Sequence, residues 1–439
     1  MMEFFGSLQG MGIENGTLTM FALLVVLLLT GMPLAYVTLL VALIFALGWF
    51  GPQVVPLITS RVYSFVSSFV FVSVPMFVLM AAILDRSGIA RDLFDAMKLL
   101  GGRLRGGVAI QTIAVAVVLA AMSGIIGGEI VLLGLVALPQ MLRLGYDKHL
   151  AIGVVCAGGA LGAMVPPSIV LIIYGLTANV SVGDLFTASV LPGLMLAGFY
   201  VIYILIRAYL NPALAPVQEP DETTFADKLR LLKGLILPIF VVIGVLGSIY
   251  GGIASVTEAS AVGVAGVILS TIVRREFTLG LLKGAALQSL RTVGMIVWIG
   301  IGASALVGVF NLMGGIRFVS DLITGISDNP LIVLLSMMLI LFVLGMFLDW
   351  VGIALLTMPI FVPVIIKLGY DPVWFGVVFA MNMQISFLTP PFGPAAFYLK
   401  SVAPPDISLG TIFRSLVPFI CLQILAIAVL IAFPGITGR

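Results

Sequence analysis

The chain has 439 residues, of which 61% are hydrophobic and only 9% are charged, and its formal net charge is +2. A soluble domain of this size would carry about a quarter charged residues, so the composition excludes an ordinary water-soluble protein and predicts a chain embedded in lipid. The small net charge gives no sign of a nucleic-acid partner. Glu3 and Glu14 are the charged residues of the first twenty, so we expect no cleaved signal peptide.

Charge-free stretches mark candidate membrane helices, because a spanning helix needs about 20 apolar residues. They lie at residues 15–60, 62–84, 106–128, 150–183, 185–206, 234–257, 259–273, 292–316, 329–348, 350–366, 372–399 and 415–438. The first stretch fits two passes or one long helix bent at residues 31–33, and the sequence leaves both open. The pattern predicts an all-α, polytopic membrane protein.

Basic loops orient these helices, because Lys and Arg gather on the cytoplasmic side. They form three clusters: Arg86, Arg91, Lys98, Arg103 and Arg105; Arg207, Lys228, Arg230 and Lys233; Arg274, Arg275, Lys283 and Arg291. With all three in the cytoplasm, the loops near Asn179 and Gly251 fall outside. A polar linker, residues 211–233, holds most of the second cluster. We expect the third, in residues 274–291, to form a short interfacial helix on the membrane surface.

A re-entrant hairpin is needed to reconcile two further basic residues with this topology. Arg143 and Lys148 would also be cytoplasmic, although a hydrophobic stretch separates them from Arg105. A hairpin over residues 106–141 that enters and leaves on the cytoplasmic side resolves the conflict. Residues 123–124 would lie near its tip.

An internal repeat at one constant offset is the most informative feature of the sequence. Leu-Gly-Tyr-Asp at 144–147 recurs at 368–371, and Pro-Pro at 166–167 recurs at 390–391, without gaps. We call the number of sequence positions from Leu144 to Leu368 the repeat offset. Under the charge-based topology the second hairpin, residues 329–366, opens from the opposite side, so the repeat is inverted. Inverted repeats with broken helices are typical of secondary transporters, which hold substrate and coupling ions where the broken helices meet.

The two Pro-Pro segments are predicted to interrupt helices within the membrane. An interrupted helix leaves backbone groups unpaired, which is costly in hydrocarbon unless something binds them. Carbonyl groups, together with Ser or Thr hydroxyls, are oxygen ligands suited to Na⁺, and the positive ends of half-helices suit an anionic substrate group. The alternative is that Pro-Pro merely kinks two packed helices; two matched copies beside hairpins favour the ion sites.

Three acids that border charge-free stretches are predicted to lie within the membrane, and such residues are functional candidates. Asp349, at the turn of the second hairpin, is expected to bind an ion or to set the geometry of the tip. Glu129 in the first hairpin is expected to contact ion or substrate, and the sequence does not choose between them. Glu258 begins a helix, where an acid favours the helix dipole, so we assign it a structural role. The sequence holds one histidine and no metalloprotease motif, so no enzyme activity is expected.

Several motifs share their order and spacing with a known family. They are Ser-Val-Pro-Met-Phe at 73–77, Ser-Gly at 123–124, Gly-Tyr-Asp at 145–147, Leu-Gly-Ala-Met-Val-Pro-Pro-Ser at 161–168, Phe-Leu-Asp at 347–349, Met-Pro-Ile-Phe-Val-Pro at 358–363 and Leu-Thr-Pro-Pro-Phe-Gly at 388–393. Over nearly its whole length the chain resembles the large permease subunit of the TRAP (tripartite ATP-independent periplasmic) transporters.

The resemblance implies an elevator mechanism, in which two hairpins and two broken helices slide as one domain against a scaffold. It implies Na⁺ as the coupling ion, no other cofactor, and an organic acid delivered by a periplasmic binding protein. It further implies a small four-helix membrane subunit as a partner, not fused to this chain, and a multi-pass location in the bacterial inner membrane.

The resemblance also implies one Na⁺ near each hairpin tip. The first site is expected at Ser123, Gly162, Val165 and Pro167, and the second at Gly345, Asp349, Ser386, Thr389 and Phe392. Many relatives have glycine where Ser386 stands. The substrate region is expected at Gly124, Glu129, Ser168, Asn382, Pro390, Pro391 and Gly393.

The predicted organisation has five parts. They are N-terminal scaffold helices at 1–61, the first repeat at 62–178, scaffold helices and connectors at 179–291, the second repeat at 292–400 and a C-terminal helix at 401–439. The alternative function is a stand-alone Na⁺- or proton-coupled carboxylate carrier with the same two-hairpin plan.

The charge-based topology makes a direct prediction about labelling. Single cysteines placed at Lys98 and Arg274 should react with membrane-impermeant thiol reagents only from the cytoplasm, because both belong to basic clusters. A cysteine at Asn179 should react only from outside. Labelling of positions 98 and 179 from the same side would refute the predicted hairpin.

Overall fold

The computed structural model describes residues 7–89, 92–94, 96, 104–124, 127–217 and 225–438, and the regular elements in these ranges are all helices. Seven of the described helices are long and apolar enough to cross a membrane. The predicted all-α, polytopic architecture is therefore confirmed. Arg91, Lys98 and Arg103 of the first basic cluster lie outside the described residues.

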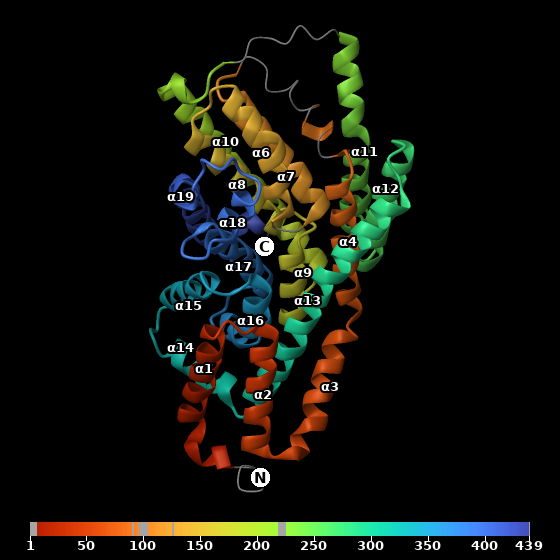
Figure 1. Cartoon of the computed structure of the whole chain (residues 1–439). Coiled ribbons are helices and arrows are strands. Elements are labelled where there is room, and N and C mark those ends of the chain that lie inside the picture. Colours follow the sequence, from red (N-terminus) through yellow and green to blue (C-terminus); the bar gives the residue numbers. More distant parts are fainter. Residues whose placement is uncertain are drawn as a thin grey trace.

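The helices form two groups, which we call the frame and the central unit (Figure 1). The frame holds α1 (Gly12–Leu29), α2 (Leu34–Phe50), α3 (Val55–Val66), α4 (Ser73–Arg86), α11 (Phe225–Tyr250), α12 (Val256–Val273), α13 (Leu279–Leu312) and α14 (Gly315–Thr324). The central unit holds α6 (Gly107–Ser123), α7 (Gly128–Arg143), α8 (Lys148–Ala160), α9 (Ile169–Ala178), α10 (Val182–Leu210), α15 (Pro330–Gly345), α16 (Trp350–Lys367), α17 (Pro372–Leu388), α18 (Pro394–Lys400) and α19 (Leu409–Ala432). Each group packs mainly within itself.

Three segments either settle a question that the sequence left open or correct an expectation from it. The first apolar stretch forms two helices, α1 and α2, separated at residues 30–33. Helix α11 begins at Phe225, inside the segment predicted as a linker. Residues 279–291 are the first turns of α13 and not a separate surface helix. The two glycines of this segment, Gly280 and Gly284, cost about 1 kcal/mol each, too little to end the helix, so the amphipathic segment continues into the apolar run.

The repeat extends through the helix order of the whole chain. Helix α3 begins at Val55 and α13 at Leu279, and α8 begins at Lys148 and α17 at Pro372, so each partner starts one repeat offset later. The same order pairs α1–α2 with α11–α12, the hairpin α6–α7 with α15–α16, and α10 with α19. The 34 residues of α13 form one helix of about 51 Å, whereas its counterpart is divided into α3 and α4.

The repeated Leu-Gly-Tyr-Asp motif has a local structural cause. Gly145 and Gly369 adopt φ of +79° and +84°, which favours glycine. Each ends a hairpin leg in a Schellman turn, since the amide of Tyr146 donates to the Met141 carbonyl at 3.0 Å, and that of Tyr370 donates to the Ile365 carbonyl at 3.1 Å. The aspartate that follows caps the next helix: Asp147 accepts from the Leu150 amide at 2.9 Å. The motif thus joins each hairpin to its broken helix.

Glycines let the frame helices approach closely. A Cβ atom at Gly302 of α13 would lie 2.2 Å from the Thr38 hydroxyl of α2, and one at Gly300 would lie 2.1 Å from the Phe65 ring of α3. Such distances leave no room for a side chain, so the long helix α13 is held directly against the backbone of α2. The frame is therefore a closely packed support beside the central unit.

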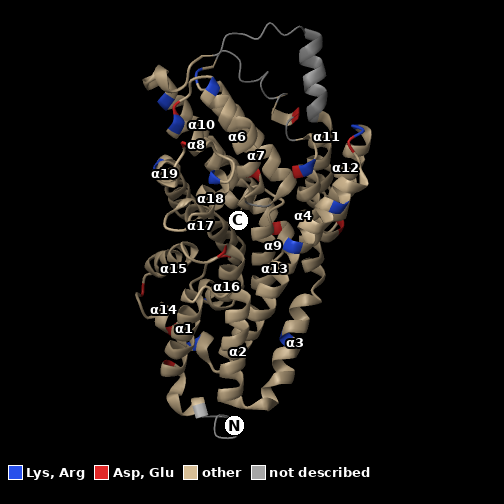
Figure 2. Cartoon of the chain, in the orientation of Figure 1, with Lys and Arg blue, Asp and Glu red and all other residues tan. Residues whose placement is uncertain are grey.

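Charged side chains are sparse, and most of the described Lys and Arg lie in the upper half of Figure 2. One cluster there joins the segment after α4 to the loop between α12 and α13. Arg274 contacts Asp92 at 2.7 Å and Glu276 at 2.9 Å, and the second Glu276 oxygen accepts from the Gly88 amide at 3.0 Å. The hydrogen bond from Arg274 lowers the pKa of Glu276 below its usual 4.5.

This cluster predicts a pH-dependent contribution to stability. Because the folded-state pKa of Glu276 is depressed, its contribution is present above the usual pKa and is lost as pH falls through the folded-state value. At pH 7, Glu276→Gln should lower stability by about 0.5 kcal/mol, since the group is partly exposed. Thermal unfolding in detergent should show a lower melting temperature for the variant than for the wild type, and this difference should disappear in acid. Asp328→Asn, an equal charge change in an exposed loop, serves as the control; a difference independent of pH would contradict the assignment.

Candidate functional site

The tip of the first hairpin is fastened to the break between α8 and α9. Gly124 ends α6 with φ of +60°, and its carbonyl accepts a hydrogen bond from the Ile169 amide, the first residue of α9, at 3.2 Å. A Cβ atom at Gly124 would lie 2.0 Å from the Pro167 carbonyl oxygen. Only glycine fits at this position, and the close contact brings Gly124, Ser123 and Pro167 together.

Glu129 completes this first cluster. Its carboxylate accepts a hydrogen bond from the Ser123 hydroxyl, and a Cβ atom at Gly162 would lie 2.8 Å from Glu129 Oε1. The side chain is buried, and among the described residues its second oxygen, Oε2, has no hydrogen-bond partner. The structure therefore places Glu129 with Ser123 and Gly162, two of the residues predicted for the first ion site.

The break itself is enclosed. Residues 161–170 are all buried, including Val165 and the cis Pro166-Pro167 peptide. The Ser168 hydroxyl donates to the Ala163 carbonyl at 2.6 Å across the break. Ser168, predicted for the substrate region, thus supports the backbone of the interruption. Oxygen atoms from hydroxyl, carboxylate and carbonyl groups all converge here.

The second hairpin meets α17 in a corresponding way. A Cβ atom at Gly345, the last residue of α15, would lie 2.4 Å from Cβ and Oγ of Ser386. The Ser386 hydroxyl donates to the Asn382 carbonyl at 3.2 Å and lies 3.4 Å from that of Phe342. The side-chain amide Nδ2 of Asn382 donates to the Met338 carbonyl at 3.0 Å. Gly345, Ser386 and Asn382 therefore share one contact between hairpin and broken helix.

The remaining residues predicted for the second site lie around it. Asp349 caps α16, since its carboxylate accepts from the Val351 amide at 3.1 Å. The Thr389 hydroxyl donates to the Ile385 carbonyl at 2.7 Å, which leaves its oxygen lone pairs available. Phe392 is 58% exposed, with its ring 5.7 Å from that of Phe397. Gly393 has φ of +27°, and a Cβ atom there would lie 2.9 Å from the Thr389 carbonyl oxygen.

The two breaks differ in exposure. Pro166 and Pro167 are buried, whereas Pro390 and Pro391, joined by the corresponding cis peptide, are both exposed. The second break therefore faces open space and the first faces protein. A molecule that approaches from outside the central unit can reach the second break more easily.

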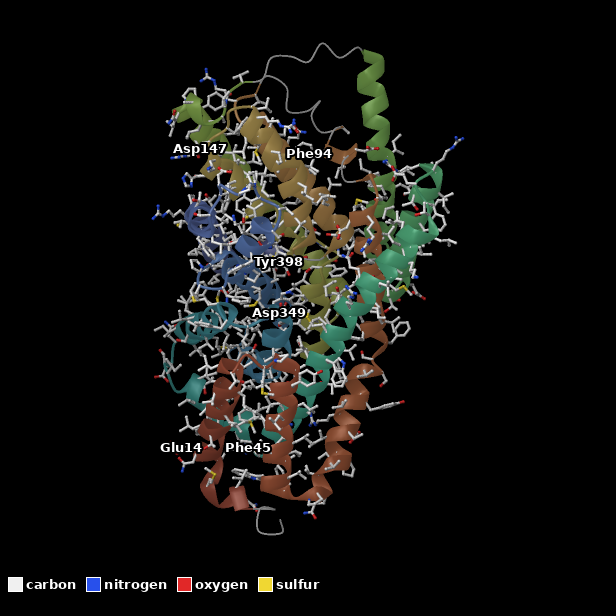
Figure 3. All side chains as sticks on the ribbon, viewed as in Figure 1. Glu14, Phe45, Phe94, Asp147, Asp349 and Tyr398 are labelled. Atoms are coloured by element: carbon white, nitrogen blue, oxygen red, sulfur yellow. The ribbon has the colours of Figure 1, made fainter. Side chains whose placement is uncertain are left out.

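Tyr398 of α18 is a site residue that sequence reasoning missed. A Cβ atom at Gly127, beside the first hairpin tip, would lie 2.9 Å from its ring, and Tyr398 also lies near enough to Asp349 at the second tip to interact with its charge. Figure 3 shows Tyr398 and Asp349 close together in the middle of the molecule. The available signal was the repeat, because Tyr398 corresponds to Tyr174 at the repeat offset.

Two hairpins and two broken helices, duplicated at one offset and surrounded by membrane helices, define a polytopic membrane transport protein. The chain belongs to the DctM family: the family model "Tripartite ATP-independent periplasmic transporter, DctM component" matches residues 21–436. The resemblance to the TRAP large permease subunit is thereby confirmed. Membership and the apolar helices together make the chain a multi-pass protein of the bacterial inner membrane.

Similar proteins agree with this family. The "C4-dicarboxylate TRAP transporter large permease protein DctM" of Pseudomonas aeruginosa is 30% identical over 391 residues, covering 88% of this chain and 90% of that protein. The "Ectoine/5-hydroxyectoine TRAP transporter large permease protein UehC" of Ruegeria pomeroyi is 30% identical over 424 residues, covering 95% and 97%. The crystal structure of the Alcanivorax borkumensis YdaH transporter matches with a TM-score of 0.62 at 16% identity, covering 88% and 90%, and this likeness concerns the fold alone.

The contact between Gly345 and Ser386 predicts a compensating pair of substitutions. Gly345→Ala should destabilise the protein by about 1–3 kcal/mol, because the new methyl group meets Ser386 at a distance that side chains do not tolerate. Ser386→Gly in the same chain removes both clashing atoms and should restore most of the thermal stability in detergent. Gly294→Ala, in α13 with nothing within 4 Å, is the matched control. If the double variant is no more stable than Gly345→Ala alone, the contact is wrongly drawn.

Proposed function

We propose that this chain is the permease of a Na⁺-coupled importer of organic acids that works by an elevator movement of the central unit against the frame. The observation that carries the proposal is the pair of matched clusters, in which each hairpin tip meets a broken helix and the two junctions are related by the repeat offset. Such half-helix junctions hold substrates and coupling ions in secondary transporters.

The substrate class and the partners follow from the family. The name of the family describes three components and a periplasmic location, and the named relatives carry C4-dicarboxylates or ectoine. We therefore propose an organic acid as the substrate, a periplasmic binding protein that delivers it, and a small membrane subunit that widens the frame. The exposed second break, with Asn382 behind it and Tyr398 beside it, is the proposed substrate region.

Na⁺ is the proposed coupling ion because oxygen atoms are the ligands that both clusters offer. At the first site we propose the Ser123 hydroxyl, the Glu129 carboxylate and backbone groups of residues 162–167. The unpartnered Oε2 of Glu129 supports this choice, because a buried carboxylate that stays ionised needs a positively charged partner. At the second site we propose the Thr389 hydroxyl and backbone groups near Ser386 and Gly345, with Asp349 holding the tip.

The elevator movement is proposed from the way the helices pack. Both hairpins and both broken helices contact one another within the central unit, while α2, α3, α4, α12 and α13 contact one another within the frame. A stand-alone carrier remains the alternative function. Robust uptake of free acid by this chain alone, without a binding protein or a small subunit, would favour that alternative.

The symmetry mates Thr389 and Val165 provide the sharpest test of the Na⁺ sites. Thr389→Val removes a hydroxyl but keeps the side-chain shape and the backbone carbonyl. Loss of one ligand to an ion should cost about 1–3 kcal/mol, so the apparent Na⁺ affinity should fall about 5- to 150-fold. Val165→Thr should have a much smaller effect, because the carbonyl at that position remains.

The measurement is the initial uptake rate against Na⁺ concentration in proteoliposomes that contain the complete complex, with a panel of carboxylates. If Thr389→Val leaves the half-saturating Na⁺ concentration unchanged in a folded protein, the hydroxyl is not a ligand. If Asp349→Asn also leaves the half-saturating Na⁺ concentration unchanged, the proposed second ion site is wrong. Uptake by the wild type that ignores the Na⁺ gradient would refute Na⁺ coupling itself.

A further inference from the structure

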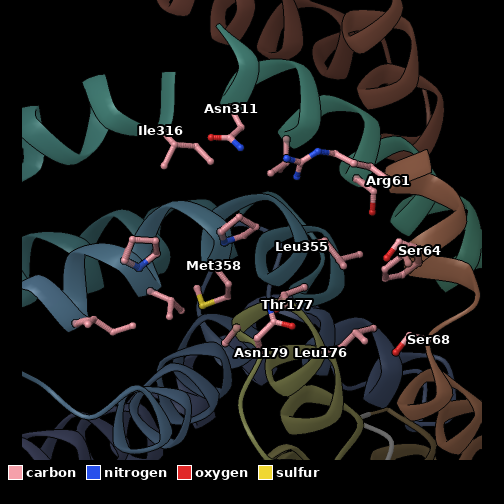
Figure 4. Close-up of a pocket in the computed structure, with 18 residues that line it drawn as sticks. Arg61, Ser64, Ser68, Leu176, Thr177, Asn179, Asn311, Ile316, Leu355 and Met358 are labelled. Carbon is pink, nitrogen blue, oxygen red and sulfur yellow. The ribbon is translucent and has the colours of Figure 1, made fainter. Parts of the chain in front are cut away.

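A cavity of about 820 Å³ lies between the frame and the central unit, away from the two clusters described above. Helices α3, α13 and α14 form one side, and α16 with the end of α9 forms the other (Figure 4). Its volume falls within the range of about 300–1,000 Å³ that is typical of small-molecule sites. A ligand there would touch both groups of helices.

Arg61 of α3 supplies the positive charge of this cavity. Its side chain runs along α13 at Gly308, where a Cβ atom would lie 2.9 Å from Arg61 Cδ. Because Gly308 has no side chain, the Arg61 side chain can pass beside α13 and its guanidinium can reach the cavity. Among the described residues no acidic side chain forms an ion pair with Arg61, and the cavity lining contains no Asp or Glu.

The walls on either side of Arg61 differ in character. Ser64 of α3 and Asn311 of α13 line the cavity on the side of Arg61, and Asn179 at the end of α9 lines it from the other side, so polar groups face the same space (Figure 4). The opposite wall belongs to α16 and is apolar, with Leu355 and Met358 among its residues. One cation with hydrogen-bonding neighbours and a facing apolar surface suits an organic molecule that carries an anionic group.

The predicted topology places this cavity toward the outside. Asn179 belongs to a loop predicted to be external, and the α16 residues that line the cavity extend from Leu355 to Ile366, next to the predicted outer end of the second hairpin. Basic residues are uncommon near external loops because Lys and Arg gather in cytoplasmic ones. Arg61 is therefore a cation on the side of the membrane where the topology predicts few basic residues.

We propose that this cavity receives the carboxylate of an organic acid on the outer side of the permease, with Arg61 as its partner, before the acid reaches the hairpin tips. The proposal rests on the proposed import of organic acids. An acidic phospholipid offers the same anionic chemistry, but a cavity of about 820 Å³ has the size of a small-molecule site and suits a small acid. The cavity acts as an entry site distinct from the clusters at the two breaks.

The first experiment measures the electrostatic preference of the cavity without transport. Ser64→Cys, in a Cys421→Ser background, places a thiol one helical turn from Arg61, where the two side chains are neighbours. The complete complex is treated with anionic sulfonatoethyl or cationic trimethylammonioethyl methanethiosulfonate. We expect Arg61→Gln to lower the ratio of the anionic to the cationic labelling rate about tenfold, because the variant removes one unit charge at this distance from the thiol. Arg61→Lys keeps the charge and should retain most of the preference.

Arg317→Gln is the matched control, because Arg317 is an arginine on neighbouring α14 that does not line the cavity. It removes the same charge and should leave the ratio unchanged. A ratio that ignores Arg61, or that falls equally in both variants, would overturn the anion site. The labelling needs no Na⁺ gradient, so its outcome is separate from that of the proposed coupling.

The second experiment distinguishes the two sources of the anion. Anionic labelling is repeated in vesicles of phosphatidylcholine alone, with excess succinate or sialic acid as protectants, and in vesicles that also contain phosphatidylglycerol. We expect a soluble carboxylate to slow labelling in the wild type but not in Arg61→Gln. Slowing by phosphatidylglycerol, with none by either carboxylate, would overturn the proposal in favour of an acidic lipid.

Discussion

A helix that stops inside a membrane leaves backbone N–H and carbonyl groups without partners, and the rest of this structure depends on how they are satisfied. At the first break the solution is direct: the Gly124 carbonyl at the hairpin tip accepts from the Ile169 amide at the start of α9. The tip and the broken helix therefore need each other. A hairpin that enters the membrane only part of the way is stable because a second interruption lies opposite its end.

Duplication of this arrangement creates two sites with different properties. The backbone of the two copies is alike, down to the cis peptide in each Pro-Pro pair, yet the first break is buried and the second is open. The side chains differ accordingly. The enclosed copy carries the Glu129 carboxylate beside Ser123, whereas the open copy has Thr389 where the first has Val165 and carries aromatic residues at its surface. An enclosed site suits an ion, and an open one can also receive a larger molecule.

Much of this fold could be predicted because its determinants are local in sequence. Charge-free stretches marked the helices, and the repeated Leu-Gly-Tyr-Asp motif marked the junctions, where glycine and aspartate have fixed backbone roles. The continuity of α13 could not be predicted in the same way, since an amphipathic start and an apolar remainder gave two different signals. The placement of Glu129 beside Gly162, and of Tyr398 between the two tips, depends on contacts between distant segments. No spacing rule in a single sequence reports such contacts, although the repeat itself pointed from Tyr174 to Tyr398.

The glycines show where the molecule is closely fitted and where its two groups meet. Within the central unit, Gly159 lies against the Ile130 backbone, just as Gly302 lies against Thr38 within the frame. Across the boundary two glycine contacts stand out: Gly128 of α7 faces Asp85 of α4, and Gly352 of α16 faces Leu34 at the start of α2. These two glycines are separated by the repeat offset and so occupy the same place in the two hairpins. Each hairpin therefore meets the frame through a position without a side chain, so that a frame side chain packs directly against the hairpin backbone. The proposed elevator movement would have to part these contacts, and the repeat places one of them in each hairpin.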